Sequence, residues 1–262
     1  MYALVTGASS GMGEVFAKEL AKAGYDILVV SNREEENCRV CEQLTREYGV
    51  DAIPIYSDLT TASAAEELFA HVQRLGLQIE VLVSNAGVLL FSQMQHTSLA
   101  DLDRIIALHC TTPTKLCRLF AEDMAQRGRG YILLVSSITA WTPFPTISHY
   151  ASTKAYLKSL GEALWYEYRG RGVSITTLMP SAVDTPLYRL SEKARRRLLR
   201  FGLMMSAESV VRKALKAMFR GRARCLPGVV TKIEAGFCAI MPRWVLLLVM
   251  RIPVVRKILA KV

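Results

Sequence analysis

The chain opens with Tyr2-Ala-Leu-Val-Thr-Gly-Ala-Ser-Ser-Gly-Met-Gly13, an apolar run followed by a glycine-rich turn and the start of a helical pattern. A strand that leads through such a turn into a helix points backbone N–H groups at whatever lies above the helix N-terminus. That position suits a pyrophosphate. Gly7 and Gly11 let the backbone turn tightly and approach a ligand, while Gly13 lets the helix pack closely. The stretch therefore predicts a βα unit that begins a nucleotide-binding fold.

Short apolar runs alternate with longer helical patterns through most of the 262 residues. The expected strands cover residues 2–6, 26–30, 52–56, 81–84, 131–136 and 173–179. The expected helices cover residues 12–23, 34–48, 62–75, 99–125, 148–168 and 207–219. Strands with continuous apolar faces, separated by helices, indicate a parallel sheet covered on both sides. Right-handed crossovers then give an α/β fold, a Rossmann-like doubly wound parallel sheet in a single domain.

The stretch Tyr150-Ala-Ser-Thr-Lys154 places a phenol and an ammonium group four residues apart, on one face of a helix. A lone phenol titrates near ~10 and carries protons poorly at neutral pH, but a neighbouring ammonium group lowers its pKa. The pair is therefore a candidate general acid and base. Because this spacing is common in helices, the pair alone is weak evidence for a catalytic site. Two other features strengthen it, namely Ser137 after the apolar run 131–135 and the glycine-rich turn.

Four motifs occur in order, namely Thr6-Gly-x-x-x-Gly-x-Gly13, Asn85-Ala86-Gly87, Ser137 and Tyr150-x-x-x-Lys154. At these spacings they resemble the short-chain dehydrogenase/reductase family. The resemblance implies an enzyme in which Tyr150 donates or accepts the proton and Ser137 binds the substrate oxygen. It also implies that Lys154 lowers the pKa of Tyr150 and binds the nicotinamide ribose.

The resemblance covers residues 1–226 and implies a dinucleotide site along the cleft. Asp58 would hold the adenine edge, and Thr185 would contact the nicotinamide carboxamide. The residues expected to bind the cofactor are Gly7, Ser9, Ser10, Gly11, Met12, Gly13, Asn32, Arg33, Asp58, Leu59, Asn85, Ala86, Gly87, Tyr150, Lys154, Pro180, Val183 and Thr185.

The end of the second expected strand bears on which cofactor binds. It reads Ser31-Asn32-Arg33 and lacks the carboxylate that hydrogen-bonds a ribose 2′-hydroxyl. Arg33 offers a bidentate partner for a 2′-phosphate, so we expect NADP(H) rather than NAD(H). The alternative is a solvated Arg33 that pairs with Glu35 or Glu36.

The chain departs from the family pattern at two positions. The family has an asparagine in the long central helix, where it holds a water that links the lysine to solvent, and His109 stands at that position. His109 either joins a proton relay with Lys154 or packs beneath the site without a proton role. The usual Pro-Gly after the sixth strand is Pro180-Ser181, a small change that the site should tolerate.

Composition limits the other function classes. Only Cys38 and Cys41, of six cysteines, share a C-x-x-C spacing, without a second pair or a nearby histidine, so we expect reduced thiols and no metal site. Residues 1–188 hold 15 Lys/Arg and 20 Asp/Glu, whereas residues 189–262 hold 18 Lys/Arg and 3 Asp/Glu, so the C-terminal part is strongly basic. This favours an anionic partner for the tail, but the basic residues lack the interleaved aromatics of a nucleic-acid binder.

The first strand begins at Tyr2, which leaves no room for a targeting peptide and predicts a cytoplasmic protein.

The last third of the chain predicts a hydrophobic substrate. Residues 184–206 are expected to form a lid whose apolar residues suit an alkyl chain or a steroid ring system. Residues 227–262 form an apolar tail with spaced bases, and its run 235–250 is shorter than the ~20 residues of a spanning helix. One interpretation is an interfacial helix on an anionic membrane surface, with Trp244 at the headgroup level. The other is an arm packed on its own domain or on a partner subunit.

Together these features predict NADPH-dependent reduction of a ketone to a secondary alcohol on a hydrophobic, long-chain substrate of the 3-oxoacyl or 3-ketosphinganine type. A hydroxysteroid is the alternative substrate, and a dinucleotide-binding sensor or scaffold without turnover is the alternative function. The resemblance also implies a homodimer or tetramer formed through the long helices 99–125 and 148–168. Binding by the tail would place the protein at the cytoplasmic face of a membrane.

Overall fold

The computed structural model describes residues 1–142, 145, 147–185, 196, 197, 199 and 204–251. Its centre is a parallel sheet of seven strands in the order β3-β2-β1-β4-β5-β6-β9. These strands are β1 (Tyr2–Thr6), β2 (Asp26–Ser31), β3 (Ala52–Tyr56), β4 (Ile79–Ser84), β5 (Gly130–Val135), β6 (Val173–Leu178) and β9 (Arg224–Cys225). The strand order reverses between β1 and β4, and this switch point is where open α/β sheets bind ligands.

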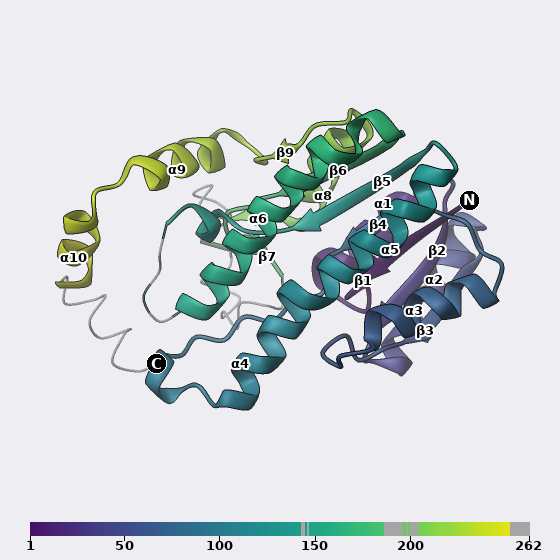
Figure 1. Cartoon of the computed structure of the whole chain (residues 1–262), viewed down its shortest axis with the longest axis horizontal. Coiled ribbons are helices and arrows are strands. Elements are labelled where there is room, and N and C mark those ends of the chain that lie inside the picture. The colour runs from purple at the N-terminus through teal and green to yellow at the C-terminus, as the bar shows by residue number, and fades with distance from the viewer. Residues whose placement is uncertain (143–144, 146, 186–195, 198, 200–203, 252–262) are drawn as a thin grey trace.

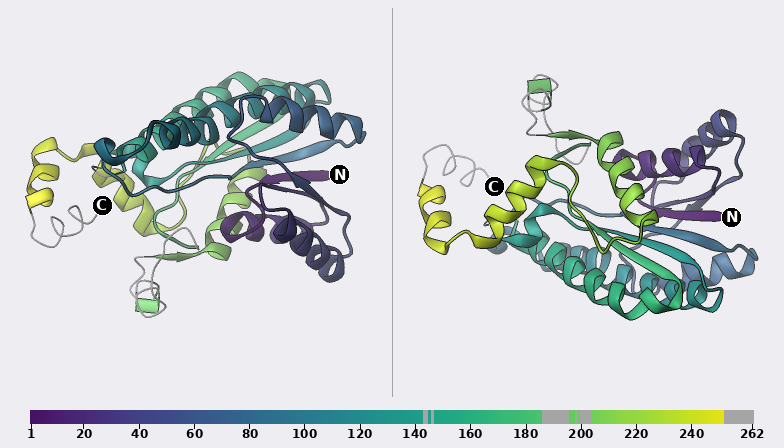
Figure 2. Two further views of the ribbon diagram at one scale, coloured as in Figure 1. Left: turned by 90° about the horizontal axis from the view of Figure 1, so that it is seen from below. Right: turned by 90° about the horizontal axis from the view of Figure 1, so that it is seen from above.

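Helices cover both faces of the sheet (Figures 1 and 2). One face carries α1 (Gly11–Lys22), α2 (Glu34–Tyr48) and α8 (Ala207–Phe219). The other carries α3 (Ala64–Arg74), α5 (Thr112–Gln126) and α6 (Ser148–Tyr168). Successive residues of β1 alternate between the two cores, with Ala3 and Val5 in the first and Leu4 in the second. The doubly wound α/β fold expected from the sequence is thus confirmed.

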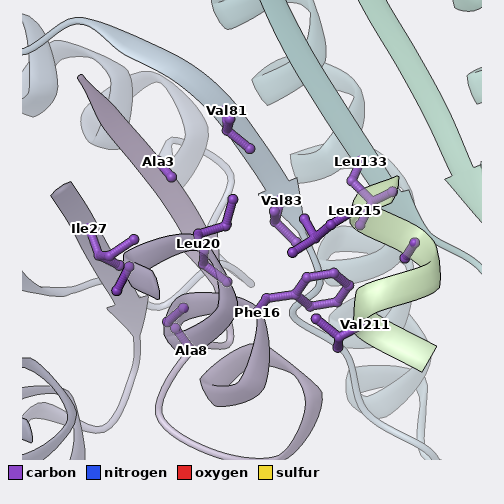
Figure 3. Packing of buried hydrophobic residues seen from close by; sticks show 14 of the residues in the cluster. Ala3, Ala8, Phe16, Leu20, Ile27, Val81, Val83, Leu133, Val211 and Leu215 are labelled. Carbon is purple, nitrogen blue, oxygen red and sulfur yellow. The ribbon is translucent and has the colours of Figure 1, made fainter. Parts of the chain in front are cut away.

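The first core holds the glycine-rich turn in place. Phe16 of α1 is fully buried and lies between the sheet and α8, where Val211 and Leu215 face it (Figure 3). Val83 of β4 and Leu133 of β5 close the same cluster from the sheet. This packing fixes the N-terminus of α1 over the switch point of the sheet.

The long helix expected over 99–125 is divided. The structure has α4 (Leu99–Ile106), a π-helical turn η2 (Ala107–Thr111) and then α5. Pro113 has no N–H to donate to the carbonyl of His109, four residues earlier, so the regular α-helical ladder cannot continue through this point. The π-helical turn centres on His109.

The remaining elements are short. They are the 3₁₀ turns η1 (Met94–His96), η3 (Ile138–Trp141) and η4 (Arg169–Arg171), the parallel pair β7 (Val183–Asp184) and β8 (Met205–Ser206), and the helices α9 (Val229–Ile240) and α10 (Arg243–Arg251). The apolar run 235–250 is therefore not one helix, because α9 ends before Pro242. The two-residue strands were not expected from the sequence, since they are too short to show a pattern. Within the described residues, no helix is both long and apolar enough to cross a membrane.

Candidate active site

The glycine-rich turn has the backbone that its sequence requires. Gly7 and Gly11 adopt φ values of 67° and 60°, in the left-handed region that favours glycine. A Cβ on Gly13 would lie 2.0 Å from the carbonyl oxygen of Gly7, so only glycine fits where α1 crosses the turn. The turn therefore presents bare backbone at the start of α1, as a phosphate-binding loop does.

The segment after β4 is tied to the same turn. The hydroxyl oxygen of Thr6 accepts hydrogen bonds from the backbone N–H groups of Asn85 (2.9 Å) and Ala86 (3.0 Å). The side-chain amide of Asn85 donates to the carbonyl of Thr6 at 3.0 Å. A Cβ on Gly7 would lie 2.9 Å from Cα of Ala86, so the two segments approach each other closely. Together they form one wall of a cleft.

The cleft runs along the carboxyl ends of β1 to β6 and contains about 1320 Å³ of empty space, part of it open to solvent. Most of the predicted cofactor residues line it. They are Gly7, Ser9, Ser10, Gly11, Met12, Asn32, Arg33, Asp58, Leu59, Asn85, Ala86, Gly87, Tyr150, Lys154, Pro180, Val183 and Thr185. Gly13 is buried beneath the turn rather than on the wall. Asp58 also shapes its own loop, since one carboxylate oxygen accepts from the N–H (3.0 Å) and the hydroxyl (2.8 Å) of Thr60.

A buried network holds the end of β2. The hydroxyl of Ser31 donates to the side-chain carbonyl of Asn37 at 2.6 Å, and the Asn37 amide donates to the carbonyls of Ser31 and Ile55. Ser31 Oγ also accepts from the N–H of Arg33 at 3.1 Å. The Arg33 side chain is exposed at the cleft, and no carboxylate of the described residues forms an ion pair with it. The pairing of Arg33 with Glu35 or Glu36 is thus absent from the described part of the chain.

Ser137, Tyr150 and Lys154 lie together at the other end of the cleft, and each is at most 9% exposed. Ser137 follows β5, and its hydroxyl oxygen accepts from the N–H of Thr139 at 3.2 Å. The ammonium nitrogen of Lys154 lies 5.5 Å from the centre of the Tyr150 ring. The structure thus brings the three predicted catalytic residues to one place, Ser137 from the segment after β5 and the other two from α6.

Burial sets the charge state of Lys154. Its ammonium group donates to the carbonyl oxygen of Val135 at 2.9 Å. Desolvation lowers the pKa of Lys154 from 10.5 to about 8, because a buried cation loses its hydration. The side chain is therefore mainly protonated at neutral pH, and its positive charge favours the phenolate form of Tyr150.

His109 is fully buried beneath the site. Its Nε2 accepts the backbone N–H of Val88 at 3.0 Å, so the neutral ring carries its proton on Nδ1. Nδ1 lies 3.0 Å from the hydroxyl of Thr153, which donates to the carbonyl of Tyr150 at 2.8 Å. Burial lowers the pKa of His109 well below its usual range. Both ring nitrogens are thus occupied by contacts that join the Val88 segment to α6.

Sequence reasoning did not identify several residues that line the cleft. They are Thr60, Val88, Arg104, Leu108, Val135 and Ser136. Arg104 comes from α4, where it lies 3.6 Å from the carboxylate of Asp101. No local pattern marks these side chains, because the fold alone brings their elements to the cleft. Most of the expected lid lies outside the described residues, including Leu187, Tyr188, Leu190, Leu198, Phe201 and Leu203.

The geometry fits a nicotinamide dinucleotide. The bare turn at α1 suits a pyrophosphate, because a Cβ at Gly7 or Gly13 would clash with its neighbours. Asp58 and Leu59 lie toward the β2–β3 side, while Lys154 and Tyr150 lie beside β5. A ligand that reaches from the turn to Tyr150 would be elongated, as a dinucleotide is.

Known proteins give an independent comparison. The very-long-chain 3-oxoacyl-CoA reductase of Mus musculus is 28% identical over 247 residues, which cover 93% of this chain and 76% of that protein. The 17-beta-hydroxysteroid dehydrogenase type 3 of Danio rerio is 30% identical over 255 residues, which cover 94% and 78%.

Solved structures agree on the fold. A short-chain dehydrogenase from Sphingobium yanoikuyae in complex with NADPH matches with a TM-score of 0.78 at 25% identity, and the match covers 94% of each chain. A structure of a 7beta-hydroxysteroid dehydrogenase reaches a TM-score of 0.84 at 22% identity over 92% of each chain. Residues 1–196 match the family described as short chain dehydrogenase. The chain therefore belongs to the short-chain dehydrogenase family, which comprises NAD(P)(H)-binding oxidoreductases that act on CH–OH and C=O groups.

Proposed function

We propose that the protein reduces the ketone of a long-chain, lipid-like substrate to a secondary alcohol with NADPH. The observation that carries this proposal is the arrangement of Ser137, Tyr150 and Lys154 at one end of a cleft shaped for a dinucleotide. Similarity to very-long-chain 3-oxoacyl-CoA reductases supports a 3-oxoacyl substrate. A 3-ketosphinganine-type substrate likewise carries its ketone between a polar head and a long alkyl chain.

The chemistry follows from the three side chains. A bound nicotinamide cofactor supplies the hydride that the carbonyl carbon accepts. Ser137 donates a hydrogen bond to the carbonyl oxygen, and Tyr150 gives that oxygen its phenolic proton. The Lys154 ammonium stabilises the tyrosinate that is left, in a site from which water is largely excluded.

His109 serves as a positioning residue in this proposal. Its Nε2 already accepts the N–H of Val88, and its Nδ1 faces Thr153. A ring held neutral in this way has no acceptor left for a proton from Lys154. Of the two roles left open by the sequence, this geometry supports packing beneath the site.

The preference for NADP(H) rests on Arg33 at the end of β2. A guanidinium group beside a 2′-phosphate forms charge-assisted hydrogen bonds that NAD(H) cannot make. We expect Arg33→Ala to raise the KM for NADPH roughly tenfold or more while the KM for NADH changes little. Arg39→Ala is the matched control, because Arg39 is also exposed on α2 but pairs with Glu14 at 3.5 Å. A wild-type enzyme that prefers NADH would contradict the assignment.

The substrate class can be tested by following NADPH absorbance with ketones that differ in chain length and head group. For 3-oxoacyl-CoA substrates we expect kcat/KM to rise about three- to fourfold for each added methylene until the apolar site is filled. A 3-ketosphinganine and a 17-ketosteroid complete the panel. No dependence on chain length would overturn the lipid proposal.

Hydroxysteroid dehydrogenation is a second candidate function. It is supported by the 17-beta-hydroxysteroid dehydrogenase relatives, which match about as well as the 3-oxoacyl-CoA reductases. In the same panel, a steroid ketone turned over faster than every acyl substrate would favour this candidate. Cofactor binding without turnover of any ketone would favour a sensor or scaffold.

We also propose that the protein acts in the cytoplasm, at the cytoplasmic face of a membrane, and forms a homodimer or tetramer. The apolar, basic segment 227–262 supports the membrane contact. Tyr156 and Tyr166 are exposed on α6, which supports pairing of this helix with a second copy.

A further inference from the structure

The helix α9 turns its apolar side away from the protein. Its inner side carries Thr231 and Ala235, which are 1% and 4% exposed. Four large apolar side chains follow one another along the opposite side at helical spacing. They are Val229, Ile233, Phe237 and Ile240, with exposed fractions of 71%, 66%, 57% and 80%. A surface helix of a soluble domain has the reverse arrangement, so this face is built for contact with something apolar.

The next helix also exposes large apolar side chains. Trp244, Leu247 and Leu248 of α10 are also exposed. Both helices lie at the end of the molecule opposite the N-terminus, set apart from the sheet (Figures 1 and 2). We call the seven side chains of α9 and α10 the outer row. Single exposed apolar residues elsewhere, such as Leu99 and Tyr166, do not form such a row.

The length and charge of the segment suit a bilayer surface. At 1.5 Å per residue, the 12 residues of α9 and the 9 of α10 fall well short of the ~30 Å hydrocarbon core. Residues 227–262 contain six lysines and arginines against one glutamate, and Lys232 and Arg251 are exposed. Anionic headgroups attract such a segment. A second copy of the same basic segment would instead repel it, which disfavours self-association through the outer row.

The helix α9, which carries most of the outer row, lies close to the segment that holds Ser137. The helix α9 packs against η3, the turn that begins directly after Ser137. Two cations lie over the ring of Trp141 in η3. Lys158 Nζ of α6 is 4.4 Å and Arg224 Cζ of β9 is 5.8 Å from the ring centre, so these contacts join η3 to α6 and β9. A bilayer that meets the outer row would therefore lie beside the substrate end of the cleft.

We propose that the outer row of α9 and α10 inserts into the interface of an anionic bilayer and holds the catalytic cleft against the lipid. The delivery of a lipid-like ketone from that bilayer to Tyr150 rests on the proposed function. The membrane contact itself assigns a surface to the membrane location proposed above, and it does not depend on the proposed reaction.

The test is co-flotation of the full-length protein with vesicles of phosphatidylcholine, with and without phosphatidylserine. We expect flotation with the anionic vesicles, and a weakening of this binding at high salt. The double substitution Ile233→Ser and Phe237→Ser should lower the partition coefficient at least about tenfold. Tyr56→Ser with Leu75→Ser is the matched control, which removes two exposed large apolar side chains away from α9, α10 and the helices proposed to pair, and should leave flotation unchanged.

Two results would overturn the proposal that the outer row binds a bilayer. One is wild-type protein that does not float with either vesicle. The other is an outer-row variant that still floats but has a smaller oligomeric size by light scattering, which would identify a second copy as the occupant. Turnover of a detergent-dispersed ketone by the same variants separates the two proposals. Retained turnover with lost flotation supports the membrane contact, and absent turnover with retained flotation refutes only the proposed reaction.

Discussion

At the residue scale, Lys154 keeps a charge where burial opposes it. The residue is 4% exposed, and its ammonium group donates to the carbonyl of Val135. Desolvation brings its pKa down to about 8 without neutralising it at pH 7. A cation held in this way costs folding free energy and is typical of a functional site.

This cost gives a prediction for stability. Because the unfolded chain binds more protons than the folded chain between pH 8 and 10.5, the Lys154 contribution to the free energy of unfolding rises with pH in that window. Below pH 8 the free energy of unfolding is lowered by the full cost of burying the charged Lys154. We expect Lys154→Met to be about 1–2 kcal/mol more stable than wild type at pH 7, after allowance for the lost hydrogen bond, while turnover is abolished.

The measurement is urea denaturation of both proteins from pH 7 to 10. The buried thiols of Cys41, Cys117 and Cys225 have raised pKa values and affect both proteins alike, so their contribution cancels in the difference between the proteins. That difference should shrink as the pH rises above 8. Lys216→Met, at an exposed site on α8, should give a difference that stays constant. A Lys154→Met protein that is less stable at pH 7 would refute this account of the site.

At the element scale, the central helix shows which features a sequence can predict. Its apolar periodicity predicted a helix, and the structure has α4, η2 and α5 in its place. Pro113 signals the interruption locally. The hydrogen bonds from Val88 to His109 and on to Thr153 join residues far apart in the chain. No local pattern could have predicted them.

These contacts predict how His109 variants behave. Asparagine offers an acceptor for the N–H of Val88, so His109→Asn should keep kcat within about threefold and leave the shape of its pH profile unchanged. Alanine leaves a buried donor unpaired and a cavity, so His109→Ala should lose roughly 2–4 kcal/mol of stability and much of its turnover. Thr153→Val is the control that removes the Nδ1 contact, together with the hydrogen bond to the carbonyl of Tyr150, and keeps the bond from Val88 to His109. A shifted pH profile in a stable His109→Asn protein would instead support a proton relay.

At the scale of the whole molecule, the cleft is assembled from the carboxyl ends of successive parallel strands. Sequence motifs located the turn after β1, the segment after β4 and the residues beside β5, because each motif has strict backbone or chemical requirements. They missed Arg104 of α4 and Leu108 of η2, which reach the cleft only through the tertiary fold. They left open whether the apolar side of the tail faces a membrane or the protein, since a helical pattern does not show which side faces the protein.

The central claim is that this cleft reduces a ketone with Tyr150 as the proton donor. The most direct measurement compares wild-type and Tyr150→Phe proteins in NADPH oxidation with a long-chain 3-oxoacyl substrate, alongside NADPH binding followed by fluorescence. The account predicts that kcat falls by about 10²–10⁴-fold while NADPH affinity is retained, because phenylalanine keeps the ring but has no proton to give. Near-normal turnover by Tyr150→Phe would contradict it.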